Sequence, residues 1–168
     1  KKKFDAMERE RMTLFNSLDK FSEDVLNAAP AEGKWSILQI IYHLVSAEKG
    51  TLAYIKKKTL SPENLEKAGI KEWWKSRLLN FYLKAPKKWK APPQVSDIPN
   101  SLNKNEVLDS YIKIRAEWRE FLSEMPGDWV GKKIFRHPIT GRMDLFMTLD
   151  FLELHAKRHF GQIQSIIN

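Results

Sequence analysis

The sequence predicts an all-α protein folded as a four-helix bundle, with a long, partly helical connection between the second and third helices. Four long stretches of the 168 residues carry apolar side chains at spacings of three and four, with charged residues between them. This is the period of an amphipathic helix, and no convincing run of alternating apolar and polar residues predicts a strand. Because a chain of this length can bury about 70% of its unfolded surface, we expect a single domain over residues 1–168.

The first two helices have visible boundaries. The first is predicted over residues 4–28 and ends before Pro30, because proline cannot continue the helical hydrogen bonds. Ser36 begins the second helix as its N-cap, and Gln39, three residues later, completes a capping box. Trp35 precedes the cap, the position of a hydrophobic staple that would pack against Ile40.

The connection between the bundle halves covers residues 56–103. A lysine run and a proline end the second helix, and a short helical pattern follows at residues 71–83. Aromatic and aliphatic residues populate this pattern: Trp73, Trp74, Leu78, Leu79 and Tyr82. We expect them to cover the bundle core; the alternatives are a pocket mouth and the surface of a homodimer.

The third and fourth bundle helices are also marked by caps. Asn103 and Glu106 form a capping pair, and the helix that follows runs to about Met125, where Pro126-Gly127 stops it. The last helix begins near Asp144, a good N-cap residue. These boundaries complete the four helices of the bundle.

Two of the four histidines, His155 and His159, lie one turn apart in the last helix. Their Cβ atoms are then about 6 Å apart on one face, so both imidazoles can bind a single cation. The other residues of this face are mostly apolar, which turns the pair toward the core. His43 lies inside another strongly apolar helix. This third histidine favours a metal site over the alternative, in which the imidazoles only satisfy hydrogen bonds.

Three motifs carry a resemblance to a known family. They are Trp35-Ser36-x-x-Gln39-x-x-x-His43-Leu44, His137-Pro138-Ile139-Thr140-Gly141 and His155-x-x-x-His159-x-x-Gln162-Ile163. In order and spacing these motifs resemble the DinB/YfiT-like superfamily, over residues 10–168. The resemblance implies a four-helix bundle in which His43, His155 and His159 bind a divalent metal that is open to water on one side. Members of the superfamily include thiol S-transferases, thiol-dependent isomerases and proteins regarded as hydrolases, and many are dimers.

Three neutral imidazoles leave at least one coordination position for water or substrate, as in catalytic metal sites. Zinc, nickel and iron(II) all suit these ligands. The metal would either acidify a water molecule or hold the thiolate of a low-molecular-weight thiol. We therefore expect a metal-dependent enzyme that acts on a small molecule, as a thiol S-transferase or a hydrolase. The alternative is a non-catalytic bundle that serves as a ligand-binding or dimeric interaction module.

The sequence identifies no general base. Asp150 and Glu153 fall on the far face of the last helix from His155, and Glu48 lies about 140° round its helix from His43. None of these carboxylates is therefore directed at the histidines. The base remains unassigned.

Three further residues have candidate roles near the site. Arg158 and Tyr54 could contact an anionic or thiol substrate, although Arg158 is equally suited to the surface. His137 precedes a proline and is therefore held extended. We expect it to bind the loop backbone rather than the metal.

Composition and charge limit the compartment in which we expect the protein and the partners that we expect it to bind. The chain has no cysteine, which excludes disulfides and thiolate ligands and suits the cytoplasm. It has no apolar run long enough for a membrane span and no apolar signal core, so we expect no membrane partner and no secretion. The 29 Lys and Arg against 21 Asp and Glu give a net charge of +8. These cations are scattered among carboxylates without a nucleic-acid motif, so we expect a small-molecule substrate rather than a nucleic acid.

Overall fold

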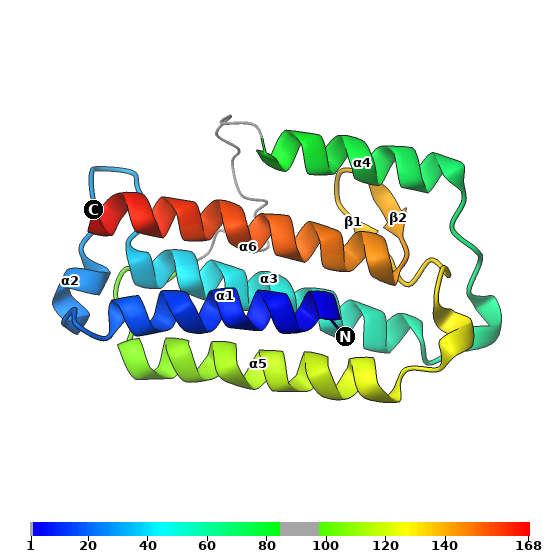
Figure 1. The fold of residues 1–168 in the computed structure, drawn as a ribbon, viewed down its shortest axis with the longest axis horizontal. Coiled ribbons are helices and arrows are strands. Elements are labelled where there is room, and N and C mark those ends of the chain that lie inside the picture. Colours follow the sequence, from blue (N-terminus) through cyan, green and yellow to red (C-terminus); the bar gives the residue numbers. More distant parts are fainter. Residues whose placement is uncertain (1, 85–97) are drawn as a thin grey trace.

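Four long helices form a bundle in the computed structural model, which describes residues 2–84 and 98–168. They lie lengthwise side by side (Figure 1): α1 (Lys2–Leu18), α3 (Ile37–Lys58), α5 (Lys104–Glu124) and α6 (Leu145–Ile167). Both α1 and α3 pack against α5 and α6, so α1 and α3 lie at diagonal corners. The predicted four-helix bundle is therefore confirmed.

The first predicted helix is divided in the structure. Helix α1 ends at Leu18, and a separate short helix, α2 (Glu23–Asn27), follows a turn. The hydroxyl of Ser22 accepts the N–H of Val25 at 3.4 Å and so caps α2. The prediction of one helix over residues 4–28 was wrong because the apolar pattern continues through the turn: Leu18 and Leu26 are both fully buried.

The other helix starts agree with the predicted caps. The backbone N–H of Ser36 donates to Oε1 of Gln39 at 2.9 Å, and the N–H of Gln39 donates to Oγ of Ser36 at 3.2 Å. The side chains of Asn103 and Asp144 each accept the N–H of the third residue along, at 3.0 and 2.8 Å. These bonds satisfy backbone donors that the first turn of a helix leaves free, and they fix where α3, α5 and α6 begin.

A small hairpin precedes α6. Strands β1 (Phe135–His137) and β2 (Gly141–Met143) pair antiparallel, with Phe135 opposite Met143. Gly141 has a positive φ of 82°, which glycine adopts without strain. The sequence predicted no strand here because three residues are too few for an alternating pattern to be recognised. Two short 3-10 helices lie in the connections: Pro62–Asn64 between α3 and α4, and Gly127–Trp129 between α5 and β1.

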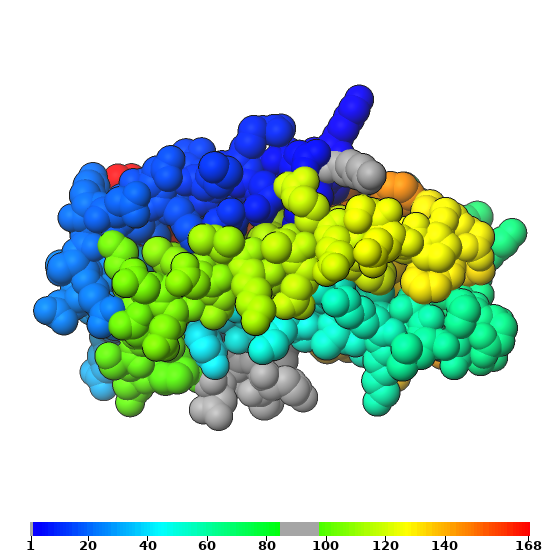
Figure 2. Space-filling view, turned by 90° about the horizontal axis from the view of Figure 1, so that it is seen from below, coloured from blue at the N-terminus to red at the C-terminus, as the bar shows by residue number. Residues whose placement is uncertain are grey.

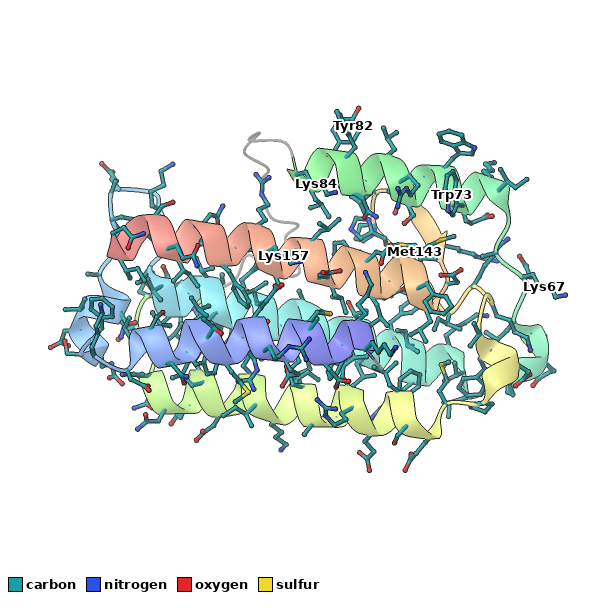
Figure 3. All side chains as sticks on the ribbon, in the orientation of Figure 1. Lys67, Trp73, Tyr82, Lys84, Met143 and Lys157 are labelled. Carbon is teal, nitrogen blue, oxygen red and sulfur yellow. The ribbon has the colours of Figure 1, made fainter. Side chains whose placement is uncertain are left out.

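Helix α4 (Ile70–Lys84) confirms the helical pattern predicted at residues 71–83 and packs against α6 and β2, outside the bundle (Figure 1). Its Leu79 is buried, but Trp74 is 64% exposed. The side chain of Tyr82 extends away from α6 (Figure 3). Trp73 and Leu78 are also exposed, at 46% and 53%, so the expectation that these five residues cover the core was wrong for all of them except Leu79.

On the side of the bundle opposite α4, helix α5 lies between α1 and α3 (Figure 2). Between α3 and α5 lies a buried ion pair in which Nη2 of Arg115 donates to Oε1 of Glu48 at 2.7 Å. The hydroxyl of Tyr111 donates to the same oxygen at 3.0 Å.

No helix within residues 2–84 and 98–168 combines the length and the apolarity that a membrane crossing requires.

Candidate metal centre

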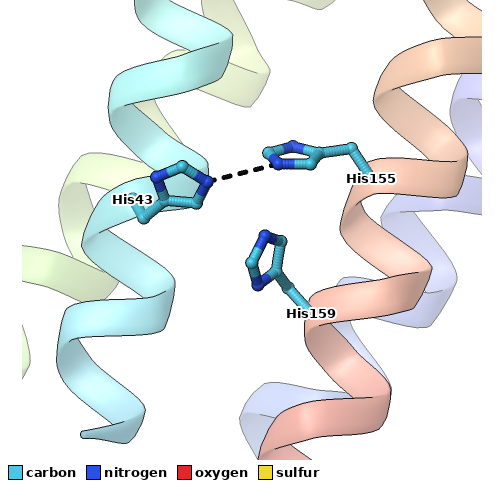
Figure 4. A group of neighbouring side chains, drawn as sticks. All are labelled: His43, His155 and His159. Atoms are coloured by element: carbon cyan, nitrogen blue, oxygen red, sulfur yellow. Dashed lines mark hydrogen bonds between the residues drawn. The ribbon is translucent and has the colours of Figure 1, made fainter. Parts of the chain in front are cut away.

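His43, His155 and His159 come together between α3 and α6 (Figure 4). Each offers a ring nitrogen, and the three nitrogens lie within 4.8 Å of one another. The ring centroids are 4.7 to 5.1 Å apart. The structure thus assembles the three histidines that the sequence singled out.

The distance between two of the ring nitrogens suits a shared metal ion. Nε2 of His43 lies 3.2 Å from Nε2 of His155. Two nitrogens that each bind zinc at about 2.0–2.1 Å with tetrahedral angles are about 3.3–3.4 Å apart. A hydrogen bond between two neutral imidazoles gives a similar distance. It would, however, engage only two of the three rings, whereas the third also directs a nitrogen into the same space.

The side chain of Gln162 fixes the third imidazole. Its Oε1 lies 2.8 Å from Nδ1 of His159. Because an amide oxygen can only accept, Nδ1 carries the proton and Nε2 keeps its lone pair. Metal-binding histidines commonly have such a partner, which holds the ring and sets its tautomer. The sequence contained this residue in the motif of the last helix but gave no reason to assign it this role.

An indole covers one side of the cluster. The ring of Trp35 lies 4.9 Å from that of His43 and is stacked 6.4 Å from that of His159, measured between centroids. The residue is partly buried against the core. The staple with Ile40 stays a prediction, and contact with the imidazoles is a role that sequence spacing did not reveal.

Burial keeps the histidines of α6 neutral. The pKa of His155 lies well below its usual value of 6.5, first because of burial and then because of its imidazole neighbours. Burial, with the neighbouring His43, lowers the pKa of His159 to about 4, against a smaller opposing effect of Gln162. Neutral imidazoles are the form that binds metal, so both rings are prepared for coordination at pH 7.

His137 lies beside the cluster rather than in it. Its Nδ1 accepts the backbone N–H groups of Ile139 and Thr140 at 3.2 and 3.4 Å, which confirms the expected binding to the loop backbone. Its ring meets that of Phe151 edge-on at 4.6 Å, and Phe151 in turn stacks on His155 at 5.5 Å. The hairpin therefore supports the site indirectly through one phenyl ring.

The carboxylates considered as bases are engaged elsewhere. Glu48 binds Arg115, as described above. Asp150 and Glu153 both bind Nζ of Lys3, at 2.5 and 2.7 Å, on the side of α6 that meets α1. The structure thus agrees with the sequence in directing none of the three toward the imidazoles.

The two candidate substrate contacts have other partners. Nη1 of Arg158 donates to the carbonyl of Leu83 at 3.1 Å and so ties α6 to the end of α4. Tyr54 lies eleven residues after His43 on α3, about 16 Å along the axis. Its ring packs edge-on against Phe135 of the hairpin at 5.6 Å. Arg158 lies next to His159 in the chain, whereas Tyr54 lies about three turns of α3 from His43. Contact of either residue with a substrate stays a prediction.

Comparison with known proteins agrees with this architecture. The model of the family described as the DinB superfamily matches residues 6–163. The uncharacterized protein YuaE of Bacillus subtilis (strain 168) is 22% identical over 156 residues, which make up 93% of this chain and 91% of YuaE. The structure also resembles that of YfiT from Bacillus subtilis, described as "a probable metal-dependent hydrolase with an unusual four-helix bundle topology". The TM-score is 0.61 at 14% identity, over 98% of this chain and 83% of YfiT.

Proposed function

This chain belongs to the DinB superfamily, and from that premise we propose that it is a divalent-metal-dependent enzyme acting on a small molecule. The observation that carries the proposal is the convergence of three ring nitrogens within 4.8 Å, from His43, His155 and His159. The group consists of histidines, which suits zinc, nickel or iron(II) better than magnesium or calcium. Three protein ligands leave a position for substrate, as in catalytic rather than structural sites.

Hydrolysis is the first candidate reaction. It is supported by the resemblance in fold to YfiT, which is described as a metal-dependent hydrolase. When bound, the ion would supply Lewis-acid chemistry and a nucleophile at neutral pH. The protein's own part is to hold three imidazoles, those of His155 and His159 neutral, with Gln162 fixing the proton of His159.

Thiol S-transfer is the second candidate, and one specific observation favours it. Glu48, Asp150 and Glu153 are all occupied by cations away from the cluster. A hydrolase commonly requires a base near the metal, whereas a thiol ionised by the metal brings its own nucleophile. A low-molecular-weight thiol would then be the co-substrate.

Two measurements test the proposal. Elemental analysis of protein purified without metal-affinity resin should give about one divalent ion per chain. The same protein should then be assayed for ester and amide hydrolysis, and for thiol transfer to electrophiles, with and without chelator. Bound metal without any chelator-sensitive activity would favour the non-catalytic interaction module, and protein without metal would refute the proposal.

A further inference from the structure

The outer face of α4 carries an exposed apolar stripe that the metal site does not use. Its residues follow the spacing i, i+4, i+8, i+11, which places them on one bearing of a helix. They are Ile70 (78% exposed), Trp74 (64%), Leu78 (53%) and Phe81 (68%). Single exposed apolar residues are ordinary, but four aligned ones with two large aromatic rings indicate a binding surface.

Cations border this stripe on both sides. At 100° per residue, Arg77 and Lys84 lie along one edge, and Lys71 and Lys75 along the other. All four side chains are exposed. The one carboxylate of α4, Glu72, is turned toward the body of the protein, where it accepts the N–H of Gly69 at 2.8 Å and pairs with Lys133. The outer face of α4 is therefore apolar along its centre, positive at its edges and free of negative side chains.

We propose that this face of α4 binds the surface of an anionic lipid membrane. A helix lying in the membrane interface buries its apolar side at the acyl boundary and places Lys and Arg against the headgroups. Tryptophan and tyrosine favour this depth, because each combines an apolar ring with a polar group. Tyr82, which extends away from α6 in Figure 3, lies at the edge of the stripe and fits the same arrangement.

The position of α4 in the fold allows such contact. It lies outside the four-helix bundle, packed on α6 and β2 by its opposite side, where Leu79 and Ser76 are buried (Figure 1). A surface approaching α4 therefore meets the stripe without any separation of the bundle helices. The membrane would be contacted and not crossed, so the proposal departs from the expectation of no membrane partner, which rested on the lack of a spanning segment.

Charge argues against a second copy of this chain as the occupant. In a two-fold dimer the same patch serves both subunits, so the four bordering cations of one copy would meet those of the other. Like charges brought together at an interface oppose association. Anionic headgroups instead supply the opposite charge, and the net charge of +8 adds a general attraction to them.

Co-sedimentation with vesicles tests the inference. The intact protein should bind vesicles of equimolar phosphatidylglycerol and phosphatidylcholine, and should bind pure phosphatidylcholine much less. Replacing both aromatic residues of the stripe, Trp74→Ser with Phe81→Ser, should weaken binding by about tenfold or more. The matched control is Ile112→Ser, which removes an exposed apolar side chain from α5 and should leave binding unchanged.

A second pair of variants separates charge from apolar contact. Lys71→Gln with Lys75→Gln should weaken binding to the anionic vesicles, whereas Lys113→Gln on α5 should not. Intact protein that stays in the supernatant, equal binding to both kinds of vesicle, or equal loss in Ile112→Ser would overturn the proposal. So would a dimer, detected by light scattering, that dissociates in the aromatic variant. Circular dichroism of every variant should match the parent spectrum, because all of these residues are exposed.

Discussion

Nε2 of His43 and Nε2 of His155 lie 3.2 Å apart, although 112 residues separate them in the chain. The first belongs to α3 and the second to α6, two helices of the bundle that pack directly against each other. An ion held by these atoms and by His159 would therefore connect two helices that the sequence places far apart.

Replacing the ligands should remove the metal and spare the fold. We expect His155→Ala and His159→Ala each to lose most of the bound ion, as measured by elemental analysis. Helical content, followed by circular dichroism, should survive, because buried apolar residues hold a bundle of this size. His137→Ala is the matched control and should keep its metal, since this ring lies outside the cluster. Full occupancy in both ligand variants would refute the assignment.

Gln162→Leu should weaken metal binding without removing a ligand. Loss of the acceptor for Nδ1 of His159 frees the ring and its tautomer, and such changes cost about 10–100-fold in metal affinity. Competition with a fluorescent chelator measures the change. Gln164→Leu, at another exposed glutamine of α6, should have no effect. If the two variants behave alike, Gln162 has no special role.

Acid should release the metal. Protons compete with the ion for the imidazoles, but the pKa of His155 lies well below 6.5 and that of His159 is about 4 in the folded protein, so affinity should fall steeply only as the pH approaches about 4. Thermal midpoints measured with and without chelator should differ at neutral pH and converge as the pH approaches that value. A metal-loaded protein that shows no chelator effect at neutral pH would mean that the ion is adventitious.

The metal-free protein should itself lose stability in acid. The pKa of His159 is lowered from 6.5 to about 4 in the folded state. Between these values the unfolded chain binds more protons, so the free energy of unfolding falls as the pH falls. The full effect for this residue is roughly 3 kcal/mol. Urea unfolding at pH 7 and pH 5 should show the loss, and His159→Gln should reduce it; an unchanged pH dependence in that variant would contradict the argument.

Arg115→Met should strongly destabilise the bundle. Its loss leaves Glu48 buried without a cation, which typically costs about 3–5 kcal/mol. The control is Arg119→Met, which breaks an exposed pair with Asp5 and should cost about 1 kcal/mol or less. Urea denaturation compares the two. Equal, small losses would show that the buried pair contributes little.

The helices and the histidines could largely be predicted from local sequence. Apolar spacing identified the bundle helices and the helix at residues 71–83, and the caps at Ser36, Asn103 and Asp144 marked where three of them begin. The break between α1 and α2 escaped prediction because a turn that keeps both flanking leucines buried does not interrupt the apolar pattern. The hairpin escaped because its strands have only three residues each.

Apart from the break between α1 and α2, the sequence by itself determined where the bundle helices and α4 lie and which of them carry inward-facing histidines, because both follow from spacings within one turn. Only the tertiary structure decided that His43 meets the pair on α6 and that Trp35 covers the three histidines. It also decided that Glu48 forms an ion pair with Arg115 and does not face the histidines. It also decided that α4 turns its apolar stripe outward. These contacts depend on which faces of different helices pack together, and a helical period fixes a face only relative to its own axis.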